Sequence, residues 1–189
     1  MDDLITIVSG LPRSGTSLMM QMLEAGGMPV LTDGIRDADE DNPRGYFELE
    51  AVKQTKDDPA WLHGATGKVV KMIYLLLYDL PATYKYRIIF MRRPLSEIVA
   101  SQQTMLTRSG KEGTSLSNEQ FTSLLERELS EVDEWLGRQE NCAVHNVNYH
   151  DLLSNGESAA TALNDSVGAD LDVEAMQRVI RPELHRQRH

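Results

Sequence analysis

Short apolar runs recur along this chain and are separated by stretches with helical spacing. Most of the runs are apolar with few polar interruptions, as in strands buried on both faces of a sheet, and the last one alternates. The runs lie at residues 5–8, 28–31, 68–73, 87–91 and 142–149. Elsewhere apolar residues recur three and four positions apart, as on one face of a helix. These helical stretches lie at residues 18–23, 47–56, 95–106, 121–136, 157–167 and 172–180.

The order of these elements predicts the fold class. Strands that alternate with helices at such intervals indicate an α/β protein, with a parallel sheet covered by helices on both faces. Ser117 followed by Gln120 forms a capping box that should begin the long helix after it. The chain has no internal repeat and no stretch with the composition of a linker. We therefore expect a single domain over residues 1–189.

The segment between the first strand and the first helix carries the clearest chemistry. Gly10 and Gly15 frame this loop. Free backbone N–H groups and the positive end of the helix dipole can face an anion there, and glycine allows a close approach. Residues 10–17 read G-x-x-x-x-G-T-S, whereas an ATP or GTP loop has lysine where Thr16 stands. The sequence thus predicts a phosphate site whose cation is Arg13, and it argues against triphosphate hydrolysis.

Residues 12–17, Pro-Arg-Ser-Gly-Thr-Ser, resemble the 5′-phosphosulfate loop of sulfotransferases that use 3′-phosphoadenosine 5′-phosphosulfate (PAPS). The likeness is greater to the tyrosylprotein and bacterial branches than to the cytosolic branch. A second segment also resembles this family. A predicted strand leads to Arg93, and Ser101 follows eight positions later. In the family such a pair holds the 3′-phosphate. The resemblance therefore implies a P-loop-type parallel sheet, PAPS as cofactor, and these cofactor-binding residues: Pro12, Arg13, Ser14, Gly15, Thr16, Ser17, Arg93 and Ser101.

Two details of the 3′-phosphate segment stay open. Arg92 offers a competing register, but its partner would be Ala100, which has no side-chain donor. The cytosolic branch also closes this site with a late Arg-Lys-Gly loop, which this chain lacks. A third cation would have to come from Lys111 or from the C-terminal arginines.

The resemblance further implies in-line transfer of a sulfuryl group from PAPS to a hydroxyl or amine acceptor. By analogy with phosphoryl transfer, positioning and cations carry most of such catalysis. Arg13 is expected to neutralise the leaving phosphate. Lys71, at the end of a predicted strand, matches a lysine that family members aim at the bridging oxygen.

The general base is not decided by the sequence. The histidine of the cytosolic branch would stand at Ile73, and no histidine replaces it. Bacterial and tyrosylprotein-like members use a carboxylate from the segment after the first helix, which makes Glu48 and Asp33 the candidates. His63 is a third and weaker one, in a loop with no visible partner. Glu48 is slightly favoured, because Asp33 could instead shape the turn at Gly34.

Charge and composition limit the kinds of molecule that this protein is expected to bind. A net charge of −10 argues against a nucleic-acid or anionic-membrane surface, so the expected partner is a small-molecule or peptide sulfate acceptor. No apolar run is long enough to span a bilayer, and the acidic start of the chain does not resemble a signal peptide. Cys142 is the only cysteine, which suits a reducing cytoplasm. No metal site is expected, and a homodimer is left open.

Two other functions compete with sulfuryl transfer. A P-loop kinase for a small molecule would need lysine in place of Thr16 and an acidic magnesium ligand at a strand end. A non-catalytic nucleotide-binding protein would keep the fold without a base. The absence of a histidine at position 73 keeps the second alternative in view.

Overall fold

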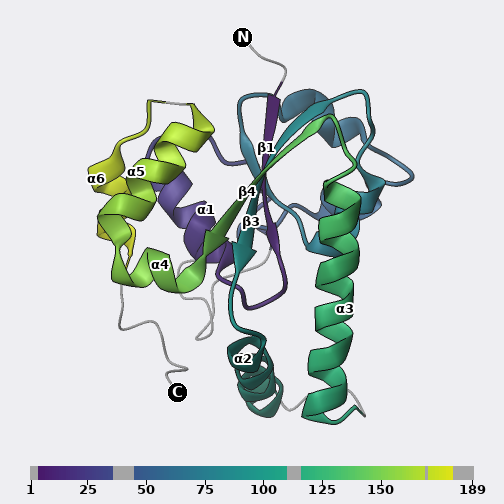
Figure 1. Cartoon of the computed structure of the whole chain (residues 1–189). Helices are drawn as coiled ribbons and strands as arrows, with labels where there is room; N and C mark the ends of the chain where they lie inside the picture. Colours follow the sequence, from purple (N-terminus) through teal and green to yellow (C-terminus); the bar gives the residue numbers. More distant parts are fainter. Residues whose placement is uncertain (1–3, 36–44, 110–115, 169, 181–189) are drawn as a thin grey trace.

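A computed structural model of the chain describes residues 4–35, 45–109, 116–168 and 170–180 (Figure 1). Within these residues a parallel sheet runs in the order β2-β1-β3-β4. The chain begins at β1, forms β2 on one side of it and β3 on the other, and then adds β4 beside β3. The strands are β1 (Leu4–Gly10), β2 (Val69–Lys71), β3 (Lys85–Arg92) and β4 (Cys142–Asn148).

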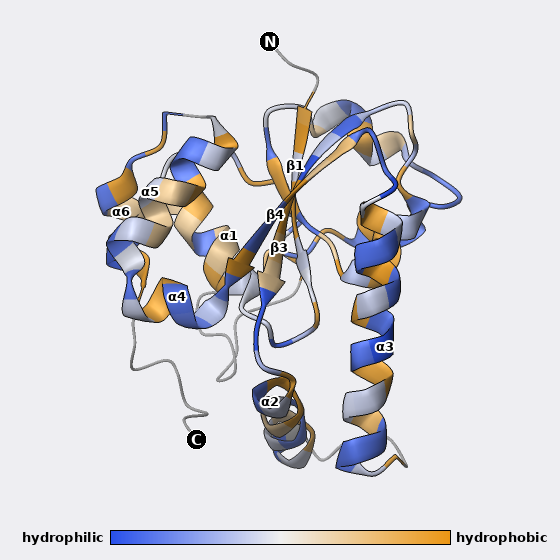
Figure 2. Cartoon of the chain, viewed as in Figure 1, coloured by the Kyte–Doolittle hydropathy of each residue, from blue (hydrophilic) through white to orange (hydrophobic). Residues whose placement is uncertain are grey.

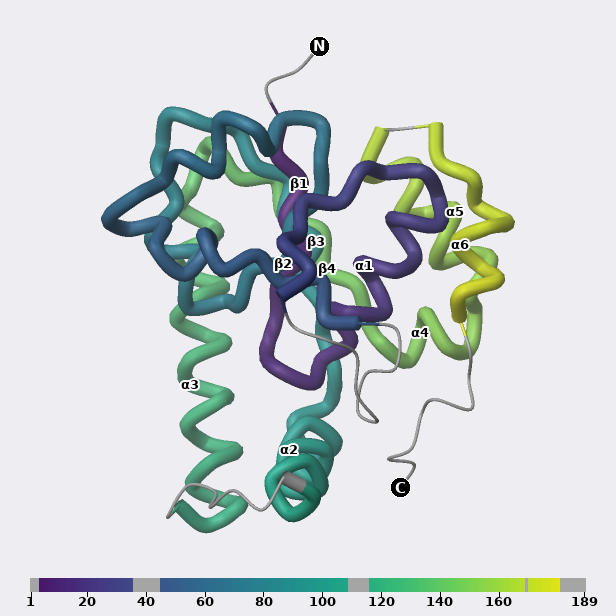
Figure 3. The backbone as a smooth tube through the Cα atoms, turned by 180° about the vertical axis from the view of Figure 1, so that it is seen from behind, coloured from purple at the N-terminus to yellow at the C-terminus, as the bar shows by residue number. Residues whose placement is uncertain are grey.

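Helices cover both faces of the sheet, and Figure 3 shows the same division from behind. On one face lie α1 (Thr16–Ala25), α4 (Tyr149–Ser154), α5 (Gly156–Val167) and α6 (Val173–Val179). On the other lie α3 (Asn118–Leu136) and the 3₁₀ turns η1 (Glu50–Gln54), η2 (Ala60–Gly64) and η3 (Tyr74–Asp79). The helix α2 (Leu95–Ser109) extends beyond the carboxyl ends of the strands and packs against α3.

The residues of β3 show why both faces need a cover. Tyr86, Ile88 and Phe90 are buried in the core under α3, whereas Ile89 and Met91 are buried in the core under α1 and α5. Successive side chains of a strand point to opposite faces, so an uninterrupted apolar run supplies two cores. The hydropathy colouring of Figure 2 shows the strands as apolar along most of their length. The predicted class, a parallel sheet flanked by helices, is confirmed.

Two predicted elements are wrong in kind or extent. The expected strand at 28–31 is a single bridge between Val30 and Val69, because Pro29 has no N–H to extend the ladder. The expected helix at 47–56 is only the 3₁₀ turn η1. Its apolar stripe was weak, and Val52 is the one buried residue within the turn.

Other boundaries agree more closely. The capping box is present, with the Ser117 hydroxyl accepting from the Gln120 N–H and the Gln120 side chain accepting from the Ser117 N–H. Tyr149 begins α4 instead of ending β4, because the Asn148 side chain caps the backbone N–H of His150. Among the described residues, no helix combines the length and the apolar character needed to cross a membrane.

Candidate functional site at the carboxyl edge of the sheet

The carboxyl ends of all four strands meet at one edge of the sheet. Gly10 pairs in register with Met91, and Arg92 pairs with Asn148, so the segments that leave β1, β3 and β4 begin side by side. Lys71 ends β2 at the same edge, beside Val8 of β1. In open α/β sheets this edge is where ligands bind. The topology thus gathers the predicted phosphate loop, the predicted catalytic lysine and both arginines after β3.

The loop after β1 has the backbone of an anion cradle. Gly10, Arg13 and Gly15 have φ angles of 146°, 71° and 103°, which lie in the left-handed region. A Cβ atom on Gly15 would lie 2.5 Å from the ring of Tyr149, and one on Gly10 would lie 2.8 Å from the carbonyl oxygen of Met91. Both positions therefore require glycine. Arg13 is not glycine, so its left-handed conformation is strained, as occurs at functional sites.

Ser14 gives the loop an unsatisfied polar atom. Its hydroxyl is fully buried and has no hydrogen-bond partner among the described residues. A buried hydroxyl without a partner costs roughly 1–3 kcal/mol, so one that persists in a folded protein needs an explanation. It lies in the loop that opens α1, a ten-residue helix whose first N–H groups lack partners within the helix. Together these features fit an anionic ligand.

The remaining predicted loop residues are placed at the mouth of this cradle. Pro12 is exposed on the loop, and Thr16 and Ser17 open α1 with partly exposed side chains. Thr16 therefore occupies the helix position at which an ATP loop carries lysine.

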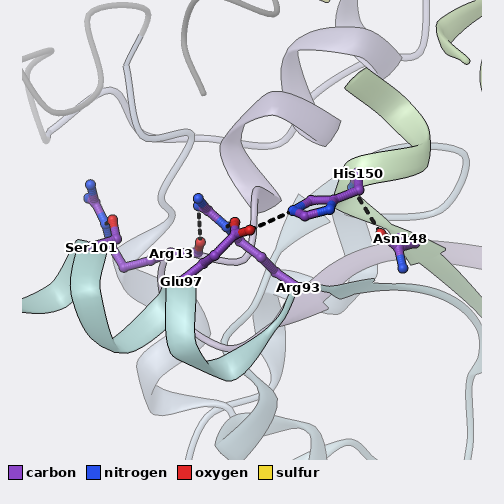
Figure 4. A network of polar contacts seen from close by, with 6 residues as sticks. All are labelled: Arg13, Arg93, Glu97, Ser101, Asn148 and His150. Carbon is purple, nitrogen blue, oxygen red and sulfur yellow. Dashed lines mark hydrogen bonds and ion pairs between the residues drawn. The ribbon is translucent and has the colours of Figure 1, made fainter. Parts of the chain in front are cut away.

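The two predicted phosphate segments contact each other directly (Figure 4). The Arg13 Nε donates to the Ser101 hydroxyl at 3.0 Å, and an Arg93 terminal N–H donates to the Arg13 carbonyl oxygen at 3.0 Å. The structure thus brings together residues that are 88 and 80 positions apart in sequence. Arg93 thus holds the backbone of Arg13, and Ser101 holds the Arg13 guanidinium.

Arg92 takes a different direction. Its Nε donates to the Asn146 side chain at 2.7 Å, and its terminal nitrogen pairs with Asp133 of α3. Its guanidinium also lies over the Phe90 ring, 4.1 Å from the centroid. Arg92 is thus committed to β4 and α3, which favours the register that uses Arg93.

Lys71 and Glu48 form the second polar pair of the edge. The Lys71 Nζ lies 3.6 Å from a Glu48 carboxylate oxygen, and the same ammonium donates to the carbonyl oxygen of Tyr46. The lysine side chain is 11% exposed and the glutamate side chain 26% exposed. Phe47, between the two acceptors, has a φ of 53°, a second non-glycine residue in the left-handed region. Backbone strain thus accompanies both candidate catalytic segments.

The other two candidate bases have different surroundings. The Asp33 carboxylate accepts the backbone N–H of Glu50 at 2.6 Å and that of Ile35 at 3.0 Å. These bonds lower the pKa of Asp33, which suits a group that shapes a turn more than one that takes a proton. His63 lies beside Tyr84, which precedes β3 at the opposite edge of the sheet.

Sequence reasoning missed Glu97 and His150. The Glu97 carboxylate accepts from Arg93 Nε at 2.8 Å and lies 2.7 Å from His150 Nε2 (Figure 4). The spacing of Arg93 and Glu97, four positions apart at the start of α2, could have signalled the first contact. No sequence pattern connects His150, which is 53 positions further on. The proposed third cations, Lys111 and the C-terminal arginines, lie outside the described residues.

Comparison with solved structures agrees with the architecture. A sulfotransferase domain from the Synechococcus PCC 7002 olefin synthase aligns with a TM-score of 0.60 at 15% identity, over 97% of this chain and 86% of that one. A sulfotransferase domain from the curacin biosynthetic pathway aligns with a TM-score of 0.55 at 14% identity, over 94% and 77%. This chain therefore has the sulfotransferase fold.

A third structure aligns too poorly to bear on the fold or the function. A sugar kinase from Janibacter sp. HTCC2649 aligns at 13% identity over 97% of this chain and 98% of that one, with a TM-score of only 0.44. A likeness of that size does not support a kinase. No protein-family model matches the sequence, and a search of curated proteins found no match. The function must accordingly be argued from the site.

Proposed function

We propose that this protein transfers a sulfuryl group from PAPS to a hydroxyl or amine on a small-molecule or peptide acceptor. The observation that carries the proposal is the direct link between the two predicted phosphate segments. Arg13 of the loop bonds Ser101, and Arg93 bonds the carbonyl of Arg13, so the two segments are directly connected, which supports a ligand with two phosphate groups. The sulfotransferase fold of the chain supports the same proposal.

The described residues fit such a ligand. Gly10 and Gly15 allow the loop to pack closely against Met91 and Tyr149, and the buried hydroxyl of Ser14 lacks a protein partner among the described residues. The N–H groups at the start of α1 would hold the 5′-phosphosulfate, while Arg93 and Ser101 would hold the 3′-phosphate. PAPS, when bound, supplies the sulfuryl group and leaves as adenosine 3′,5′-bisphosphate.

The chain's own residues would provide positioning and charge. Arg13 and Lys71 would supply positive charge to the leaving phosphate, which is the main catalytic requirement of such transfers. Glu48 would accept the proton from the acceptor hydroxyl or amine. The nearby ammonium of Lys71, 3.6 Å away, orients this carboxylate, and the bond from Lys71 to the Tyr46 carbonyl fixes the ammonium itself.

Glu48 is favoured over Asp33 on geometry. Both oxygens of Asp33 accept backbone N–H groups, so protonation of Asp33 would break bonds that hold the start of η1. The Glu48 side chain is partly exposed and contacts the candidate catalytic lysine. Its position is held by main-chain bonds, because the Glu48 carbonyl accepts from Thr32 Oγ1 and from the Asp33 N–H.

We also propose a cytoplasmic location, supported by the single cysteine. Cys142 is a free, partly buried thiol whose pKa is raised to about 11 by burial, so it stays protonated near neutral pH. A reducing compartment suits such a residue.

The direct test is turnover. The purified protein is incubated with PAPS and a panel of phenols, alcohols, amines and tyrosine peptides, and adenosine 3′,5′-bisphosphate is measured by chromatography. We expect release of the bisphosphate that depends on one class of acceptor and is lost in Lys71→Ala. Bisphosphate release that is unchanged in Lys71→Ala would contradict the proposed site.

A further inference from the structure

A buried carboxylate joins an arginine and a histidine at the β3–β4 side of the edge. The Glu97 side chain is 8% exposed and lies between Arg93 Nε, at 2.8 Å, and His150 Nε2, at 2.7 Å. Figure 4 shows the three side chains in one row beside the phosphate loop. They come from α2, from the segment after β3 and from α4, so the contact exists only in the folded chain.

The charge of this cluster depends on His150. Arg93 and Glu97 are a tight pair with both side chains 8% exposed, so their charges cancel. Arg93 is committed further, because it donates to the Arg13 carbonyl and stacks on the Tyr149 ring at 4.5 Å. As a pair, Arg93 and Glu97 therefore carry no net charge, and Arg93 can contribute to a phosphate only through its hydrogen bonds. The cluster becomes net positive only when His150 carries a proton.

The position of His150 indicates which part of a ligand it would meet. Adjacent strands lie about 4.8 Å apart, so β4 is separated from β2 by roughly 14 Å across the sheet. Lys71 and Glu48 belong to the β2 side, and His150 follows β4. His150 is therefore far from the proposed sulfuryl end and close to Arg93. Its side chain is 43% exposed, so it is accessible from solvent.

We propose that His150, oriented by Glu97, is a further cation of the site for the ligand's second phosphate, so that binding of that phosphate depends on the protonation of His150. The proposal rests on the proposed function. It supplies a positive group from the described residues, in addition to Arg93, for the part of the site that lacks the Arg-Lys-Gly loop.

Several charged or titratable groups face the imidazole. Glu97 of α2 contacts the imidazole, Arg93 from the segment after β3 shares that carboxylate, and Tyr149 and Asp151 flank His150 in α4. Imidazole is the side chain whose charge ordinarily changes between about pH 5 and 8. We expect the resulting affinity for a bisphosphate to fall as the pH rises through this range.

The test is calorimetric titration with adenosine 3′,5′-bisphosphate and with AMP, at about pH 6 and about pH 8.5, for His150→Gln, His150→Lys and the unchanged protein. One charge-assisted bond corresponds to about a tenfold change in affinity. His150→Gln should therefore bind the bisphosphate about tenfold more weakly at the lower pH and within about twofold at the higher pH. AMP, which lacks the 3′-phosphate, should be unaffected.

The variants separate the role of the proton from that of the ligand. A phosphate gains charge near pH 6, which opposes the histidine effect, so the comparison is between variants at each pH. His150→Lys carries its charge at both pH values and should remove the histidine-dependent loss at high pH. His63→Gln, the same substitution at the opposite edge of the sheet, is the matched control and should change nothing.

The outcomes distinguish this inference from the proposed function. If His150→Gln binds the bisphosphate as the unchanged protein does at both pH values, the inference fails and the proposed function stands. A second probe, inorganic phosphate, is followed by thermal shift at about pH 6. A second pattern is that the bisphosphate does not bind, while inorganic phosphate stabilises the unchanged protein but does not stabilise His150→Gln. In that case the inference holds and the proposed function fails. If neither probe binds, both are wrong.

Discussion

The edge of the sheet carries two cation–carboxylate pairs that differ in tightness. On the β2 side, Lys71 and Glu48 lie 3.6 Å apart, and the carboxylate is 26% exposed. On the β3 side, Arg93 and Glu97 lie 2.8 Å apart, with both side chains 8% exposed. The first pair is held partly by other contacts, since Lys71 also bonds the Tyr46 carbonyl. The second is closed on both sides, by Arg13 and by His150.

This difference in tightness agrees with the role proposed for each cation–carboxylate pair. A carboxylate that must take a proton has to change its charge without dismantling its surroundings, so a loose and partly exposed pair is suitable. A group that holds a phosphate loop in a strained conformation needs rigid bonds, and a buried pair with charge-assisted hydrogen bonds provides them. The same residue types thus serve as a candidate reacting pair and as a clamp. The following predictions test this contrast.

The largest effect is expected on the loose pair. Glu48→Gln should leave bisphosphate affinity unchanged and lower the rate of sulfuryl transfer by roughly 10²–10⁴-fold, the usual contribution of a general base. Asp33→Asn should retain most activity, because both Asp33 oxygens are occupied by backbone donors. Steady-state kinetics with a saturating acceptor measure both. A Glu48→Gln variant with normal turnover beside an inactive Asp33→Asn would transfer the base to Asp33.

Stability should show the opposite order for the two pairs. Glu97→Ala leaves the buried Arg93 without its counterion and should lower the free energy of unfolding by about 3 kcal/mol. Glu48→Ala removes a partner from a looser pair and should cost about 1 kcal/mol or less. Urea denaturation followed by circular dichroism measures both values. Equal losses would mean that the two pairs are equivalent clamps.

Arg93 should affect one phosphate more than the other. Arg93→Ala is expected to weaken adenosine 3′,5′-bisphosphate by about 2–3 kcal/mol through the loss of charge-assisted bonds. AMP should be affected much less, with any common loss coming from the broken bond to the Arg13 carbonyl. Calorimetric titration of both ligands gives the difference. Equal losses for the two would remove Arg93 from the 3′-phosphate site and leave it a loop clamp only.

The smallest effect concerns Asp33. Its pKa is lowered in the folded state by the backbone N–H groups of Glu50 and Ile35. A carboxyl group with a lowered folded pKa contributes stability above its unfolded pKa, about 3.9, and loses it as the pH falls through the folded value. Asp33→Asn should therefore be slightly less stable at neutral pH, with the difference vanishing in acid. Thermal denaturation across pH measures this, and a difference that grows in acid would contradict it.

The sequence predicts the layers of this fold better than its contacts. Continuous apolar runs located β1 and β3 because burial on both faces leaves a direct signature in the chain. The strand predicted at 28–31 was wrong, because a pattern of apolar residues takes no account of Pro29, which has no N–H to donate to a neighbouring strand. The loop motif, with its helix start, was equally local and readable. His150 was not, because its contact with Glu97 spans 53 positions and exists only through the order of the strands.

The central claim is that the loop at Gly10–Ser17 holds a 3′,5′-bisphosphate nucleotide and not a triphosphate. Calorimetric titration of the purified protein with adenosine 3′,5′-bisphosphate and with ATP tests it directly, each with EDTA and with magnesium. The site predicts that the bisphosphate binds tightly without metal and that ATP binds much more weakly, because Thr16 stands where an ATP loop needs lysine. Magnesium-dependent binding of ATP as the tighter of the two would contradict the account.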